Sequence, residues 1–150
     1  MSQTFLVFSS EITAFSTFEL QGTGLAEDYL NAVVSVIGQP NLDELLNAYS
    51  AIEVSDPQLR EKLLRRDIFG DEKLGPIARN IIKLWYTGVW NELPHAWTDK
   101  YGALEKNVLF IVSAAAYTEG LLWPAIGANP PGAKAPGYGS WALPPNIPVV

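Results

Sequence analysis

Few residues in this sequence have the types and spacing that acid–base chemistry requires. The single histidine, His95, lies between Glu92 and Asp99, and a histidine oriented by a carboxylate is the commonest general base near neutral pH. A loop histidine that makes one structural hydrogen bond explains the same pattern more simply. The sequence therefore favours a structural role for His95. A small self-sufficient enzyme or ligand-binding domain built on His95 and the nearby carboxylates is the alternative.

Metal and nucleotide chemistry have less support. Asp67, Asp71 and Glu72 are candidate ligands for a hard cation, but their spacing fits no calcium-binding loop. Gly22-Thr23-Gly24 lacks the preceding strand, the third glycine and the lysine of a nucleotide-binding loop. The chain has no cysteine, which excludes thiolate metal sites and disulfides, and one histidine disfavours an imidazole-based centre. We predict no catalytic residue, metal or cofactor in this chain.

The charge of the chain argues against nucleic acid as a partner. The 150 residues carry a formal net charge of −6, whereas phosphate binding needs clustered lysine and arginine. The basic residues that do cluster are interleaved with Glu61 and Asp67, as on a solvated helix face; they are Arg60, Lys62, Arg65 and Arg66.

The sequence shows neither a membrane span nor an export signal. No apolar run approaches the length of a membrane-spanning helix, so we predict no transmembrane segment. The apolar run Phe5-Leu6-Val7-Phe8 has no basic region before it and is broken by Ser9, Ser10 and Glu11, unlike a signal peptide. A chain without cysteine is compatible with oxidising and reducing compartments alike.

Apolar periodicity predicts a mainly helical fold. Residues spaced by three and four predict buried helix faces, and glycine or proline marks the ends. The predicted helices run from about Phe5 to Gly22, from Leu25 to Gly38, from Asn41 to Tyr49, from Pro57 to Leu64, from Gly75 to Gly88 and from Ser113 to Trp123. Residues 91–101 read as an irregular loop, and residues 108–112 fit a strand or a helix equally well. We expect a compact domain of about five to six helices over residues 1–123 and an extended Pro/Gly/Trp-rich arm over residues 124–150.

The final third of the chain is apolar, aromatic and almost uncharged. From Asn107 to Val150 the ionisable side chains apart from tyrosine are Glu119 and Lys134. A free monomer avoids large apolar patches and intersperses charge over its surface. We therefore expect another polypeptide to cover this region. Prolines restrict an arm before it docks, which lowers the entropy cost of binding, and tryptophans are frequent interface anchors.

Four groups of residues carry a resemblance to a known family. They are Leu84-Trp85-Tyr86-Thr87-Gly88, then Tyr117-Thr118-Glu119-Gly120-Leu121-Leu122-Trp123, then Asn129-Pro130-Pro131-Gly132, and finally Gly137-Tyr138-Gly139-Ser140-Trp141 with Pro144-Pro145. In this order and spacing, over about residues 77 to 145, they resemble the small (gamma) subunit of membrane-bound, FAD-dependent sorbitol dehydrogenases. Relatives occur in fructose, glucose and glucoside dehydrogenase complexes. The first half resembles this family only in being helical and in opening with a Phe-rich helix.

The resemblance implies a subunit without a cofactor that binds a large glucose–methanol–choline-type flavoprotein, which carries the FAD and the chemistry. It implies that this chain helps the large subunit to mature, and that a cytochrome c subunit can complete the complex. Members of this family often carry a twin-arginine export signal, and no paired arginine precedes Phe5. We therefore expect a periplasmic or membrane-associated complex if a signal was removed, and a cytoplasmic one otherwise.

The predicted partner interface combines the aromatic residues with the proline-rich segment. It consists of Trp85, Tyr86, Trp90, Tyr117, Trp123, Pro130, Pro131, Gly132, Tyr138, Trp141 and Pro144. The alternative is that Trp85, Trp90, Trp123 and Trp141 fill the domain's own core, an interpretation that the sequence favours for Trp85 and disfavours for Trp141.

Overall fold

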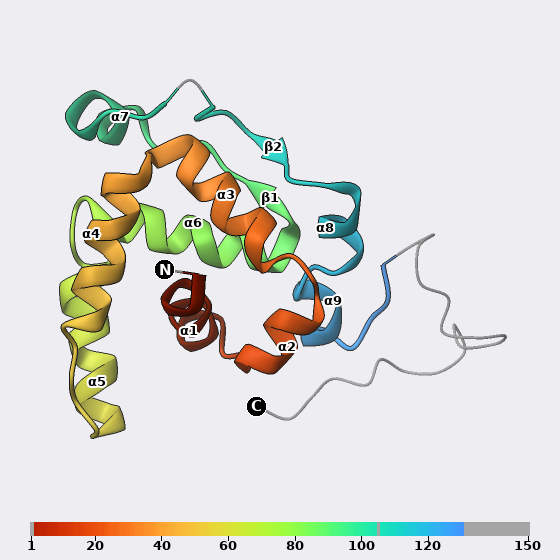
Figure 1. Cartoon of the computed structure of the whole chain (residues 1–150), viewed down its shortest axis with the longest axis horizontal. Helices are drawn as coiled ribbons and strands as arrows, with labels where there is room; N and C mark the ends of the chain where they lie inside the picture. The colour runs from red at the N-terminus through yellow and green to blue at the C-terminus, as the bar shows by residue number, and fades with distance from the viewer. Residues whose placement is uncertain (1, 105, 131–150) are drawn as a thin grey trace, which may run out of the picture.

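The computed structural model describes residues 2–104 and 106–130, and within them the chain is mainly helical (Figure 1). The helices are α1 (Ser2–Thr13), α2 (Thr17–Gly22), α3 (Ala26–Ile37), α4 (Gln39–Ser50), α5 (Pro57–Leu64), the π-helical turn η1 (Arg65–Phe69), α6 (Leu74–Thr87), α7 (His95–Tyr101), α8 (Ala114–Thr118) and α9 (Leu122–Ala125). Two short antiparallel strands, β1 (Val89–Trp90) and β2 (Phe110–Ile111), pair Val89 with Ile111 and Trp90 with Phe110. The predicted helical class is confirmed.

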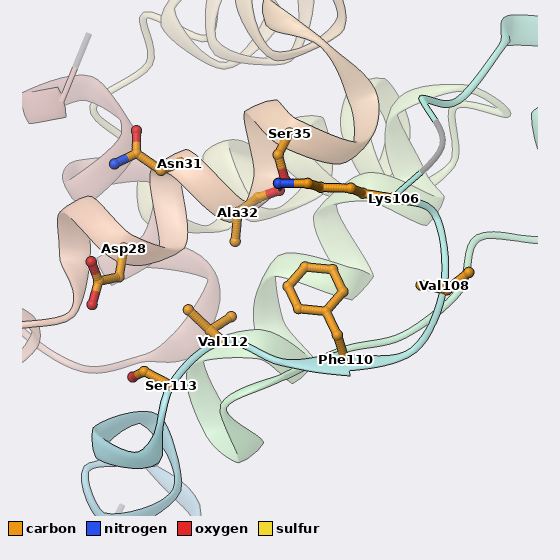
Figure 2. A pocket seen from close by; sticks show the side chains of 9 residues that line it. All are labelled: Asp28, Asn31, Ala32, Ser35, Lys106, Val108, Phe110, Val112 and Ser113. Carbon is orange, nitrogen blue, oxygen red and sulfur yellow. Dashed lines mark hydrogen bonds between the residues drawn. The ribbon is translucent and has the colours of Figure 1, made fainter.

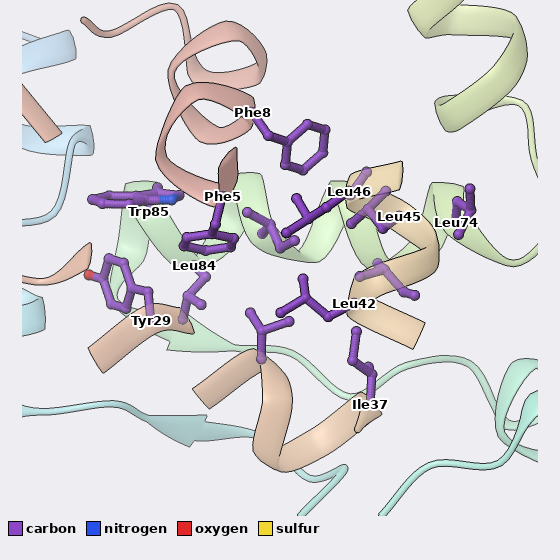
Figure 3. Close-up of a cluster of buried hydrophobic side chains, with 14 of the residues drawn as sticks. Phe5, Phe8, Tyr29, Ile37, Leu42, Leu45, Leu46, Leu74, Leu84 and Trp85 are labelled. Carbon is purple, nitrogen blue, oxygen red and sulfur yellow. The ribbon is translucent and has the colours of Figure 1, made fainter. Parts of the chain in front are cut away.

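Helix α6 is central to the packing. In Figure 1 it crosses the middle of the molecule, with α4 and α5 along one side and β2, α8 and α9 along the other. It contacts α1, α3, η1 and α9. Figure 3 shows apolar side chains of α1, α3 and α4 converging on it, among them Phe5, Tyr29 and Leu45, each at most 1% exposed.

Several predicted helices match the structure closely. The α3 and α6 helices bury the predicted faces and end at Gly38 and Gly88, both with positive φ. Asp56 caps α5 by accepting a hydrogen bond from the amide of Leu59, and Ser113 caps α8 through the amide of Ala116. The ambiguous run at 108–112 contains β2. These elements have strong local signals that the tertiary structure does not override.

The first predicted helix is wrong as a single element. It divides at Ala14, which has φ of +63°, into α1 and α2. Ser16 then forms a capping box with Glu19: its hydroxyl accepts from the Glu19 amide, and the Glu19 carboxylate accepts from the Ser16 amide. The Ser-x-x-Glu signature was present in the sequence and marks this helix start.

Three boundaries also differ from the prediction. Asn41 does not cap α4, because the helix already begins at Gln39 and the side-chain NH₂ group of Asn41 instead donates to the carbonyl of Ile37. The predicted loop at 91–101 contains α7. The predicted helix from Ser113 to Trp123 is wrong as a single element, because it divides into α8 and α9. Pro124, expected to end it, lies inside the first turn of α9, where a missing N–H is tolerated. The predicted domain boundary at Trp123 therefore falls within α9, and residues 131–150 of the predicted arm lie outside the described residues.

Within residues 2–104 and 106–130, none of the helices combines the length and apolar character that crossing a bilayer requires.

Candidate functional site

Exposed apolar side chains concentrate late in the chain. Large apolar side chains are exposed at four positions across residues 2–104 and at six across the much shorter stretch 106–130. These six are Val108, Leu109, Ile111, Tyr117, Leu122 and Ile126. We refer to residues 108–126, with these six side chains, as the apolar segment. Its only charged residue is Glu119, so it is the surface of the described chain that most resembles an interface.

Backbone hydrogen bonds attach the apolar segment to the end of α6. The amide of Leu121 donates to the carbonyl of Trp85 at 3.0 Å, and the amide of Val112 donates to the carbonyl of Gly88 at 3.1 Å. The last carbonyls of a helix have no partner within the helix. The segment therefore supplies hydrogen-bond donors to carbonyls at the end of α6, and these bonds fix its position.

Two glycines allow this close approach. A Cβ on Gly88 would lie 2.6 Å from the backbone carbonyl of Ala116, and a Cβ on Gly120 would lie 2.7 Å from the carbonyl oxygen of Tyr86. Both distances are too short for non-bonded atoms. Gly88 also has φ of +71°, which favours glycine. The stretches 84–88 and 117–121, which stand out in the sequence, are thus packed on each other inside the chain.

The strand that opens the apolar segment has two different faces. Phe110 and Val112 line a groove of about 640 Å³ beside α3, whose far wall includes Ala32 (Figure 2). Leu109 and Ile111 are 67% and 62% exposed. Successive side chains of a strand point to opposite faces, so one face of this strand packs toward the helices and the other is bare.

The end of the segment carries an aromatic pair. The rings of Tyr117 and Trp123 meet edge to face at 5.5 Å, and the indole nitrogen of Trp123 donates to the carbonyl of Tyr117 at 2.7 Å. Trp123 also lines a second pocket of about 410 Å³ between the α2 region and residues 118–130. The pair is held rigidly while Tyr117 keeps 42% of its surface exposed.

The structure separates the predicted interface residues into three groups. Trp85 and Trp90 are fully buried in the core, and half-buried Tyr86 donates from its hydroxyl to the carbonyl of Thr13 at 2.9 Å. A partner of the folded chain cannot reach the two tryptophans, so we remove them from the interface. Tyr117 and Trp123 lie in the apolar segment, and Pro130 is buried. The others lie outside the described residues; they are Pro131, Gly132, Tyr138, Trp141 and Pro144.

Sequence reasoning missed the aliphatic part of this surface. Leu109, Ile111, Leu122 and Ile126 were not among the predicted residues. For Leu109 and Ile111 the reason is that a short β-branched run reads equally well as a buried strand. The available signal was the lack of charge from Asn107 onward. With so little charge in this part of the chain, an apolar strand that is not buried on both sides leaves one apolar face exposed, as Leu109 and Ile111 do.

The structure offers no support for the alternative, an enzyme or ligand-binding domain built on His95. His95, Glu92 and Asp99 are all exposed, and neither pocket is lined by His95. Among residues 2–104 and 106–130, no three acidic, histidine or cysteine side chains are grouped as a metal site would require. An imidazole acting as a general base works best in a site that excludes water and orients the ring.

The best-organised charged cluster lies in the helical body and ties α1 to α5. Arg60 donates to both carboxylate oxygens of Glu11, at 2.6 and 2.8 Å, and Tyr49 donates to the same carboxylate at 2.7 Å. Partial burial opposes ionisation of Glu11, but the hydrogen bonds from Arg60 and Tyr49 hold its pKa below the ordinary value. Burial, with the carboxylate nearby, raises the pKa of Tyr49 to about 12. Arg60 is thus structural, unlike the exposed Lys62, Arg65 and Arg66.

Comparison with known protein families, with curated proteins and with solved structures finds no match to this chain.

Proposed function

We propose that this chain is the non-catalytic small subunit of an FAD-dependent sugar or polyol dehydrogenase complex. It binds and stabilises the FAD-carrying large subunit, of the glucose–methanol–choline type, and helps it to mature. The chain itself holds no cofactor, and the flavin chemistry belongs to the partner. The observation that carries this proposal is the apolar segment, which exposes six large apolar side chains with one charged residue among them.

The position of the sequence motifs supports the proposal. The stretch 84–88 ends α6, and the stretch 117–123 is bonded to that end through Leu121. Together they form a rigid base from which Tyr117, Leu122 and the following residues face outward. A rigid apolar surface loses little conformational entropy when a partner covers it, as suits a permanent subunit contact.

The sequence beyond Pro130 extends the same character. Residues 131–150 contain Tyr138 and Trp141, several prolines and one charged side chain, Lys134. Under the proposal, this stretch and the apolar segment bind the large subunit as one continuous interface. Under the same proposal a cytochrome c subunit can complete the complex, which is periplasmic or membrane-associated if an export signal was removed and cytoplasmic otherwise.

Co-expression tests the proposal. The chain is produced alone and together with the proposed FAD-dependent large subunit, and solubility, bound flavin and sugar oxidation are measured. We expect much of the chain produced alone to self-associate and none of it to bind flavin, whereas co-expression yields a soluble complex with an FAD-loaded large subunit. Sugar oxidation by this chain alone, or a large subunit that matures equally well without it, would contradict the proposal.

A further inference from the structure

The two-stranded sheet has an open edge at Ile111. Because Val89 pairs with Ile111, Gly88 stands opposite Val112, and the amide of Val112 bonds to the carbonyl of Gly88. In an antiparallel ladder, hydrogen-bonded pairs alternate with non-bonded pairs. The pair of Val89 and Ile111 is therefore non-bonded, and the N–H and C=O of Ile111 point away from β1. Outside the β1–β2 ladder, from which they point away, neither group has a hydrogen-bond partner among the described residues.

Residues 107–116, which include this edge, have none of the usual sequence features that protect a strand edge. Natural proteins cover exposed strand edges or interrupt them with lysine, proline or a bulge. Residues 107–116 contain no charged residue and no proline, and the exposed face of the strand carries Leu109 and Ile111. Free backbone groups next to exposed apolar side chains suit an extended polypeptide more than any other ligand.

Two charged side chains of opposite sign, Asp28 and Lys106, would fix the orientation of a polypeptide bound along this edge. The groove on the inner face of β2 has Asp28 near Ser113 at one end and Lys106 near Ser35 at the other (Figure 2). Neither side chain forms an ion pair with any residue that the structure describes. Side chains of paired residues lie on the same face of a sheet, so alternate residues of an added strand would lie toward this groove.

We propose that the outer edge of β2 pairs with an extended segment of the large flavoprotein subunit, which adds a third strand to the sheet. The segment is apolar at alternate positions, with a basic side chain toward Asp28 and an acidic one toward Lys106. The identity of this partner rests on the proposed function, whereas the pairing at Ile111 rests on the geometry of the edge.

Two variants at one position test the pairing. Ile111→Pro removes the outward N–H, and because this N–H makes no bond to β1, proline is compatible with the edge. Ile111→Thr removes a similar amount of apolar surface and keeps the N–H. Affinity for the large subunit is measured for both by titration. We expect Ile111→Pro to weaken binding about tenfold more than Ile111→Thr, and Lys106→Glu to weaken it about two- to fivefold.

Amide hydrogen exchange gives a readout that does not depend on the variants. The Ile111 amide is expected to exchange fast in the free chain and at least about tenfold more slowly in the complex. The Val112 amide, which is already bonded to Gly88, is the internal control. If the wild-type chain forms no complex, the proposed function fails. If a complex forms but Ile111 exchanges unchanged and both variants bind alike, only the edge pairing fails. Protection of Ile111 in a self-associated chain would identify a second copy as the occupant and overturn the inference.

Discussion

The helical body, residues 2–104, and the stretch that follows it, residues 106–130, treat their surfaces in opposite ways. The body buries most of its large apolar side chains around α6 and contains all five ion pairs found among the described residues. The later stretch has two charged residues, Lys106 and Glu119, and exposes six large apolar side chains. The body has the charged surface expected of a protein face in water, whereas the later stretch has the apolar, nearly uncharged surface that is typical of interfaces.

The two regions are nevertheless one packed unit. Strand β2 pairs with β1, and Leu121 bonds to Trp85 at the end of α6. The apolar segment is therefore not a loose tail, and its exposure cannot be relieved by folding back without breaking these contacts. This combination of rigid attachment and bare apolar surface is what the following substitutions test.

The largest contrast is expected between two tryptophans. Trp85→Ala empties a site in the core that is 1% exposed and should lower the free energy of unfolding by about 3–5 kcal/mol. Trp123→Ala, at the half-buried aromatic pair, should lower it by only about 1 kcal/mol while reducing co-purification of the large subunit. Urea denaturation and pull-down assays measure the two effects. Equal losses of stability would place Trp123 in the core as well.

The next effect isolates the close packing of the apolar segment on α6. Gly88→Ala should lower the free energy of unfolding by about 3 kcal/mol, because the new Cβ collides with the backbone of Ala116 and the residue must adopt a positive φ. Gly24 has the same φ of +71° but open space around it, so Gly24→Ala should cost only about 1 kcal/mol. Thermal unfolding of the two variants provides the comparison. Similar melting temperatures would show that the segment is not held against α6 as described.

Only part of the fold and of the exposed apolar surface can be predicted from the sequence. Helices with a capping residue and a regular apolar face can be predicted from the sequence because the signal is local. The start of α5 at Pro57 and the end of α6 at Gly88 are examples. The break after α1 has a local signal, the capping box at Ser16, which periodicity alone overlooks. The helix at His95 is held by distant segments, as in the bond from the Trp97 indole to the carbonyl of Lys73, which periodicity does not report. The same limit explains the site: the sequence indicates that the final third is too apolar for solvent, but not that Trp90 is buried while Ile111 is bare.

A smaller effect concerns the charged cluster of the body. Arg60→Ala should lower stability at neutral pH by about 1–2 kcal/mol, since it removes two hydrogen bonds to a partly buried carboxylate. The folded-state pKa of Glu11 is lowered, so its contribution is present above the unfolded pKa of about 4 and is lost as the pH falls through the folded value.

The stability difference between wild type and Arg60→Ala should therefore shrink as the pH falls below about 4. Denaturant midpoints measured from pH 7 to pH 3 check this. Lys62→Ala, on the exposed face of the same helix, is the control and should change stability by less than about 0.5 kcal/mol at any pH in this range. A constant difference for Arg60→Ala would mean that the ion pair contributes nothing.

The smallest effect on stability is expected in the apolar segment itself. Leu109→Ser, at a side chain that is 67% exposed, should change the free energy of unfolding by no more than about 0.5 kcal/mol. It should also reduce self-association and dye binding by the isolated chain, because it removes exposed apolar surface. Light scattering measures the association. A stability loss of several kcal/mol would show that Leu109 is covered by this chain.

Co-purification of the FAD-carrying subunit with a surface variant tests the central claim most directly. The variant combines Leu109→Ser, Ile111→Ser and Ile126→Ser, and its melting temperature is compared with that of the wild-type chain. We predict an unchanged helical body, a one-to-one complex for the wild-type chain and loss of the large subunit from the variant. Retention of the large subunit by a variant that folds normally would contradict the claim that the apolar segment is the partner-binding surface.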